Sequence, residues 1–253
     1  RLPFKYIISL NDMKIISEQN IEKLKEISAR CLGETLKKAK EEKEQVLLLL
    51  SGGSAFEITK GIKFDCLGNY LTVGMLDERL ESNPKINNFL QFKETDFYHL
   101  AKESGCEFIE SIPNEEETVG SFAKRIEYAW RNWRTQNKAG KVFITQGIGA
   151  DGHTAGVMPY GENRDFFEKT FEDRSRFVVG YDAGEKNQYP KRATATLSFL
   201  KNEVDASLVW IVGKEKIKPF NDIMSDSGNL AETPARIIRE MKNVIIFTNL
   251  NDK

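Results

Sequence analysis

Hydrophobic residues recur along the chain in two patterns, one with the spacing of a helix and one as short unbroken runs. The first helical set stands three to five residues apart among Lys and Glu, and consists of Ile21, Leu24, Ile27, Cys31 and Leu36. That spacing predicts an amphipathic helix with a solvated, charged face. The charged stretch at residues 37–43 is expected to form the exposed end of this helix. We therefore expect one long helix ahead of the first strand.

Unbroken apolar runs predict strands that are buried on both faces, as strands of parallel sheets are. The first run, residues 46–50, is followed directly by two glycines, Gly52 and Gly53, after one serine. Further strands are predicted at residues 71–76, 142–145, 177–181, 207–212 and 244–248. Each is short, as expected for strands of a buried sheet.

Helical patterns separate these runs. A short helix is expected from Ala55, and a longer one carries Val119, Phe122, Ile126, Trp130 and Trp133, whose aromatic rings we expect in the core. Helices are also predicted at residues 214–224 and 234–241, the latter with Thr233 as N-cap and Pro234 at its first position. Strands that alternate with helices predict an α/β, Rossmann-like fold: a mainly parallel, twisted sheet with helices on both faces. No linker is visible, so we expect a single domain over residues 1–253.

Composition narrows the possible partners. Among 253 residues, Lys and Arg number 37 and Asp and Glu number 38, a net charge of −1, whereas general nucleic-acid binders carry a basic excess. No apolar run approaches the roughly 18 residues of a membrane span. Three scattered cysteines predict free thiols in a reducing compartment, so a cytoplasmic location is expected. Two histidines cannot form a multi-histidine metal site.

Polar segments follow three of the predicted strands, at residues 51–54, 77–79 and 147–154. Ligands of parallel α/β sheets bind beyond the carboxyl ends of the strands, so we expect these segments to share one edge. Gly52 and Gly53 allow backbone N–H groups to approach an anion, and Ser54 adds a hydroxyl. A tight turn without a ligand is the alternative. The segment matches no nucleotide-binding glycine motif, which disfavours nucleotides.

The other two segments carry side chains suited to catalysis. Asp77 and Arg79 could hold a polyhydroxylated ligand and stabilise negative charge, although a surface ion pair is the alternative. Asp151 stands two residues before His153, and a carboxylate beside an imidazole suits a general base near neutral pH. A lone histidine is more often structural than catalytic, but His153 stands in a glycine-rich loop at the end of a predicted strand. His99 lacks such a setting and receives no role.

These three segments resemble the hallmark segments of the 6-phosphogluconolactonase/glucosamine-6-phosphate deaminase superfamily, in order and in separation. The third reads Gly-Ile-Gly-Ala-Asp-Gly-His-Thr-Ala at residues 147–155. Two later segments are also similar: residues 192–196 resemble the family's Arg-x-Thr-x-Thr strand, and residues 213–216 its Gly-x-x-Lys segment. The resemblance extends over essentially the whole chain. One departure is Asn87-Asn88, where the family has Ser-Asn.

The details resemble the lactonase branch. Deaminases have a glutamate five residues after the histidine, whereas this chain has Met158. Thr154 follows the histidine, as it does in lactonases. Arg79 stands where deaminases usually carry an aromatic residue.

The resemblance implies hydrolysis of 6-phospho-D-glucono-1,5-lactone to 6-phosphogluconate, a step of the oxidative pentose phosphate pathway, without metal or other cofactor. His153, oriented by Asp151, would activate water, and Arg79 would stabilise the oxyanion. The implied substrate-binding residues are Asp77, Gly52, Gly53, Ser54, Gly149, Arg192 and Lys216. Asp77 would hold sugar hydroxyls, and the glycine loop, Arg192 and Lys216 would hold the phosphate.

Two alternatives stay open: a glucosamine-6-phosphate deaminase-like aldose-ketose isomerase, and a non-catalytic sugar-phosphate sensor. Met158 disfavours the isomerase, and a sensor could dispense with the histidine that this chain keeps. The expected partner is a small phosphosugar lactone, with no nucleic acid and no membrane. The sequence does not determine the oligomeric state, and a monomer is compatible with it.

Overall fold

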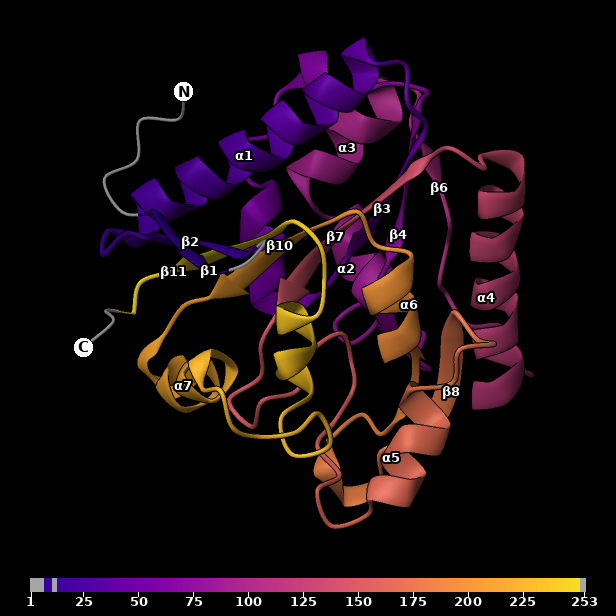
Figure 1. Cartoon of the computed structure of the whole chain (residues 1–253). Coiled ribbons are helices and arrows are strands. Elements are labelled where there is room, and N and C mark those ends of the chain that lie inside the picture. Colours follow the sequence, from indigo (N-terminus) through magenta and orange to yellow (C-terminus); the bar gives the residue numbers. More distant parts are fainter. Residues whose placement is uncertain (1–6, 11–12, 251–253) are drawn as a thin grey trace.

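The buried apolar runs form the centre of an eight-stranded sheet in the computed structural model, which describes residues 7–10 and 13–250 (Figure 1). In spatial order its strands are β1 (Ile7–Leu10), β2 (Met13–Ser17), β11 (Val244–Thr248), β10 (Ala206–Ile211), β7 (Lys141–Gly147), β3 (Val46–Leu50), β4 (Leu71–Met75) and β6 (Glu107–Phe108). Among the described strands of this sheet, only β1 and β2 pair in antiparallel fashion. The predicted mainly parallel α/β sheet is therefore confirmed.

Alternate residues of each strand face two separate cores. On β3, Leu47 and Leu49 pack in one core, whereas Leu48 and Leu50 pack in the other. The first core is covered by α4 (Val119–Gln136), α5 (Arg164–Phe171) and α6 (Leu197–Asn202). The second is covered by α1 (Ile21–Glu41), α2 (Asn88–Lys93) and α3 (Asp96–Glu103). Helices thus lie on both faces, as predicted, and Trp130 is buried in the first core.

A second, three-stranded antiparallel sheet was not expected from the sequence. It consists of β5 (Asp77–Arg79), β9 (Lys191–Ala195) and β8 (Val178–Asp182). The assignment of residues 177–181 to the main parallel sheet is therefore wrong. An apolar run indicates burial but not strand direction, because both kinds of pairing bury the same side chains. The segment 77–79, expected as a loop, continues from β4 and pairs with β9.

Several local predictions need correction. The β1–β2 hairpin precedes α1, so the first 45 residues do not form a single helix. The turn after the glycine loop is a 3₁₀ helix, η1 (Gly53–Thr59), and not an α-helix. The predicted helix at 214–224 begins as a 3₁₀ turn, η4 (Lys214–Lys216), before α7 (Ile217–Met224). The predicted helix at 234–241 is the 3₁₀ helix η5 (Pro234–Arg239).

Other local expectations agree with the structure. The charged stretch after Leu36 continues α1 to Glu41, and Asn20 caps its start by accepting from the Lys23 amide. Thr233 stands at the N-cap position of η5, but its side chain makes no capping hydrogen bond. The remaining short 3₁₀ helices are η2 (Phe64–Cys66) and η3 (Gly184–Lys186).

The structure also bears on the cysteines and on membrane-spanning helices. Cys31, Cys66 and Cys106 are all free and buried. Within residues 7–10 and 13–250, no helix is both long enough and apolar enough to cross a membrane. The predicted domain limits include residues outside the described ranges, so the full extent of the domain stays a prediction.

Candidate active site

One cavity at the carboxyl edge of the main sheet collects the residues singled out from the sequence. It has a volume of about 200 Å³. The sequence-predicted residues that line it are Gly52, Gly53, Ser54, Asp77, Arg79, Gly149, His153, Arg192 and Lys216. Asp151 does not line the cavity, but its carboxylate contacts Nδ1 of His153. The three polar segments and the two later ones therefore meet at one place.

His153 and Asp151 form a close pair at the end of β7. Nδ1 of His153 lies 2.6 Å from Oδ1 of Asp151, which also accepts the backbone amide of His153 at 3.1 Å. Burial raises the pKa of the Asp151 carboxyl, but the hydrogen bonds and charge of His153 outweigh burial and hold that pKa below its ordinary value. The carboxylate is therefore ionised near neutral pH and accepts from Nδ1 of His153, an arrangement that in the neutral imidazole leaves Nε2 with its lone pair.

The loop around this pair depends on a glycine. A side-chain carbon at Gly149 would lie 2.1 Å from Nδ1 of His153 and 2.5 Å from Oδ1 of Asp151. The Gly149 amide also donates to the carbonyl of His153 at 2.8 Å, which closes the loop. Any larger residue at this position would displace the imidazole.

Asp77 and Arg192 are joined by a buried ion pair. Nη2 of Arg192 lies 2.9 Å from Oδ2 of Asp77, and the side chains are only 4% and 8% exposed. The two residues are 115 positions apart, and β5 and β9 bring them together. The sequence resemblance implied that Arg192 would hold the phosphate. In the structure Arg192 lies on the small antiparallel sheet, and Asp77 offsets part of its charge.

Arg79 is held at the pocket by its own contacts. Nη1 donates to the carbonyl of Ile86 at 2.7 Å, and the guanidinium lies 5.8 Å from the ring centre of Tyr189.

The preceding residue, Glu78, received no role from the sequence. It is buried, and its carboxylate accepts hydrogen bonds from four donors.

Two polar side chains that line the cavity received no role from the sequence. Ser51 and Asn88 line the cavity, and both are buried. Within the described part of the chain, Ser51 Oγ and Asn88 Oδ1 have no hydrogen-bond partner, and the same holds for Nε of Arg79 and of Arg192. Buried polar atoms without partners are costly, so their presence in one cavity fits a polar ligand. Ser51 opens the glycine motif, which is the signal that could have identified it.

Lys216 reaches the same cavity from the turn that follows β10. It ends the η4 turn after β10, is partly buried, and lines the cavity together with Gly52 and Gly53.

The glycine loop forms another wall of the cavity. A side-chain carbon at Gly52 would lie 2.1 Å from Oδ1 of Asn88, so this position requires glycine. The η1 turn that follows is short and of 3₁₀ type, so we expect less helix-dipole attraction than an α-helix would give.

Met158 is fully buried in the core and does not line the cavity. The loop that leads to it is held by the second sheet: the Tyr181 hydroxyl donates to the Gly156 carbonyl at 2.5 Å, and Thr194 donates to the Ala155 carbonyl. No titratable side chain is available at position 158.

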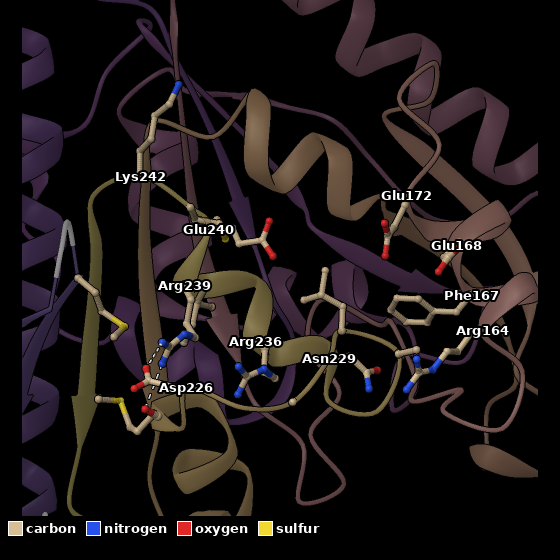
Figure 2. Close-up of a pocket in the computed structure, with 17 residues that line it drawn as sticks. Arg164, Phe167, Glu168, Glu172, Asp226, Asn229, Arg236, Arg239, Glu240 and Lys242 are labelled. Carbon is tan, nitrogen blue, oxygen red and sulfur yellow. Dashed lines mark hydrogen bonds and ion pairs between the residues drawn. The ribbon is translucent and has the colours of Figure 1, made fainter.

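A larger cavity, of about 790 Å³, lies elsewhere, between α5 and the segment that contains η5 (Figure 2). None of the sequence-predicted site residues lines it. Its arginines have structural partners: Arg236 and Arg239 donate to backbone carbonyls at the end of α7, and Arg239 also pairs with Asp226 at 2.9 Å. Cations at a helix C-terminus are stabilising in themselves. The larger cavity therefore lacks the candidate catalytic residues, which line the smaller one.

Metal ligands do not converge in the described residues. No group of three or more His, Cys, Asp or Glu side chains within 7–10 and 13–250 is arranged to hold a metal ion. The metal-free reaction implied by the sequence resemblance stays a prediction.

Comparisons with known proteins agree with the motifs. A family model described as glucosamine-6-phosphate isomerases/6-phosphogluconolactonase matches residues 19–247. The structure is similar to 6-phosphogluconolactonase from Plasmodium vivax, with 16% identity, a TM-score of 0.76, and coverage of 96% of this chain and 92% of that one. For the Trypanosoma brucei enzyme the identity is 19%, the TM-score 0.72, and the coverage 92% and 95%. For the Thermotoga maritima enzyme the values are 20%, 0.69, 93% and 97%.

No curated protein sequence gives a significant match. At identities of 20% or below, likeness to solved structures establishes the fold alone. The family model covers most of the chain and includes every segment that lines the cavity. The chain belongs to the family of glucosamine-6-phosphate isomerases and 6-phosphogluconolactonases.

Proposed function

We propose that this protein hydrolyses 6-phospho-D-glucono-1,5-lactone to 6-phosphogluconate, a step of the oxidative pentose phosphate pathway. One observation carries the proposal: His153, held by Asp151, lines the same cavity as the glycine loop and Lys216. A general base therefore lies beside groups suited to a phosphate. Solved structures of similar fold are named 6-phosphogluconolactonases, which supports the same reaction.

His153 acts as the general base in this proposal. Asp151 holds Nδ1, so Nε2 is free to take a proton from a water molecule. The water oxygen then attacks the lactone carbonyl carbon and forms a tetrahedral oxyanion. The ring C–O bond breaks next, and His153 returns its proton to the departing ring oxygen. The products are an open-chain hydroxyl and a carboxylic acid, which loses its proton to solvent.

Arg79 stabilises the oxyanion, with help from backbone N–H groups of the loop. A positive charge fixed in a pocket stabilises developing negative charge without reorganisation during the reaction. The hydrogen bond to Ile86 and the cation–π contact with Tyr189 hold the guanidinium in place, which meets this requirement.

The phosphate binds between the glycine loop and Lys216. Amides of Gly52 and Gly53 and the hydroxyl of Ser54 supply hydrogen bonds, and Lys216 supplies charge. Arg192 adds a weaker contribution, because it is paired with Asp77. Asp77 retains one carboxylate oxygen for sugar hydroxyls, since Oδ2 contacts Arg192.

The isomerase alternative is disfavoured by the core position of Met158. Ring opening and proton transfer in that branch use a glutamate at this place, as the sequence resemblance implies, and a buried thioether cannot move protons. A sensor would bind the sugar phosphate but leave its hydrolysis rate unchanged.

The deciding experiment generates the lactone in situ and follows formation of 6-phosphogluconate against spontaneous hydrolysis. We expect the rate to rise in proportion to protein concentration. Glucosamine 6-phosphate, tested in parallel for ammonia release, should give none. A protein that binds 6-phosphogluconate without accelerating hydrolysis would be a sensor, and the proposal would be wrong.

A further inference from the structure

The buried carboxylate of Glu78 has no part in the proposed chemistry, yet it contacts three segments around the pocket. It is 1% exposed and lies on β5 between Asp77 and Arg79. Oε1 accepts the amides of Arg79 at 2.8 Å and Asn88 at 2.7 Å. Oε2 accepts the Phe89 amide and the Ser111 hydroxyl, both at 2.9 Å.

Two of these donors belong to the first turn of α2. The first amides of a helix have no partner within the helix, and a carboxylate there is also favoured by the helix dipole. Glu78 satisfies the amides of Asn88 and Phe89, and the Asn87 side chain satisfies that of Leu90 at 2.8 Å. Glu78 therefore fixes where α2 begins relative to β5.

The position of α2 in turn sets one wall of the pocket. Nδ2 of Asn88 donates to the Asp77 carbonyl at 2.9 Å, and its Oδ1 faces the backbone of Gly52. Asn88 is thus hydrogen-bonded to β5 and lies against Gly52 of the glycine loop. The backbone amides of Arg79 and Asn88 both donate to Oε1 of Glu78, so this one atom fixes the two backbone segments relative to each other.

We propose that Glu78 is a positioning residue, which holds Arg79 and Asn88 in register so that the oxyanion-stabilising cation and the glycine loop face each other. The inference rests on the proposed function for its kinetic consequence, but not for the placement itself. Small displacements of a catalytic group are sufficient to lower rates on the order of ten- to a hundredfold.

The primary variant is Glu78→Gln, which keeps the size of the side chain. One amide oxygen still accepts from Arg79 and Asn88, but the NH₂ group faces the Phe89 amide, donor against donor. Ser111→Ala is a milder second variant, because it removes one hydrogen bond and leaves all backbone donors satisfied. The matched control is Thr95→Ala, which removes the cap of α3, where Thr95 accepts from the Tyr98 amide. Thr95 does not line the pocket.

Two readouts test the proposal. Amide hydrogen exchange reports placement directly, and Glu78→Gln should accelerate exchange at Arg79, Asn88 and Phe89, whereas Thr95→Ala should not. In lactone hydrolysis, Glu78→Gln should lower kcat about tenfold or more, with KM changed less than about threefold because Glu78 itself contacts none of the residues proposed to bind the phosphate. Ser111→Ala should fall between wild type and Glu78→Gln.

Unchanged exchange at these three amides in Glu78→Gln overturns the proposal, as does a kcat within about twofold of wild type. An equal loss of kcat in Thr95→Ala also overturns it, since the effect would then follow stability alone. If the wild-type protein hydrolyses no lactone, the proposed function is wrong, and the exchange measurement alone decides the role of Glu78.

Discussion

His153 is the residue on which the proposed chemistry depends most. The chain has only one other histidine, His99, which is exposed on α3 and contacts the Tyr98 ring. The pairing with Asp151 leaves one imidazole nitrogen free at the pocket. Sequence reasoning singled out this residue because it stands in a glycine-rich loop at the end of a predicted strand, two residues after Asp151, in a chain with only one other histidine.

His153→Ala should reduce lactone hydrolysis to near the spontaneous rate, because a general base contributes about 10²–10⁴-fold. The assay is the one described above, with circular dichroism to show that the fold is kept. His99→Ala serves as the matched control and should keep wild-type activity. Retention of more than about a third of the activity by His153→Ala would contradict the assigned role.

Glu78 should also leave a signature in the pH dependence of stability. Burial raises its pKa from 4.5 to about 7, against the opposing effect of its hydrogen bonds. Between these pH values the folded protein holds a proton that the unfolded chain has lost, so stability falls as pH rises. Below pH 4.5 the contribution is fully present, and above about 7 it is gone. The difference is on the order of 2–4 kcal/mol.

Urea unfolding of wild type and Glu78→Gln between pH 5 and 8 measures this directly, at roughly one-unit steps. Wild type should lose stability relative to the glutamine variant between pH 5 and 7, because glutamine does not titrate. A difference between the two proteins that is independent of pH would show that Glu78 keeps one protonation state across this range.

At the scale of elements, the η4 turn decides what Lys216 can do. β10 ends at the carboxyl edge, and the turn that follows directs Lys216 toward the glycine loop, whereas Lys214 on the same turn is exposed. The sequence placed both lysines at the start of a helix. Only the 3₁₀ turn distinguishes a cavity-lining lysine from a surface one.

Lys216→Ala should raise KM for the lactone about tenfold or more, since a charge-assisted hydrogen bond to phosphate is lost. The phosphate is remote from the reacting carbonyl, so kcat should change less than about threefold. Steady-state kinetics separates the two constants, with Lys214→Ala as the control of equal charge change. A fall in kcat with KM unchanged would move Lys216 from phosphate binding to the chemical step.

At the scale of the whole molecule, two sheets and two cores converge on one cavity. The main sheet supplies the glycine loop, the His153 loop and Lys216, and the small antiparallel sheet supplies Asp77, Arg79 and Arg192. The family model spans nearly all of this assembly, at residues 19–247. The donor groups at the cavity suit an anion and a sugar, and Nδ1 of His153 is already engaged.

Lactone hydrolysis should therefore survive dialysis against an excess of chelator. The described residues offer no cluster of metal-binding side chains, and one histidine with a nearby aspartate is not a zinc-site pattern. Activity should equal that of an untreated sample. Loss in chelator, restored by a divalent metal ion, would show that the reaction needs a metal.

The sequence by itself determined the order and place of most elements, because hydrophobic period and glycine position are local properties. It also suggested the histidine, the glycine loop and Arg79 from their chemistry, whereas Arg192 and Lys216 were proposed from the resemblance to the family. Tertiary structure alone decided strand direction in the second sheet, since an apolar run is the same in parallel and antiparallel pairing. It also decided that Arg192 pairs with Asp77, 115 residues away, and that Glu78 is buried against α2. Such contacts depend on which distant segment folds alongside, and no local pattern encodes them.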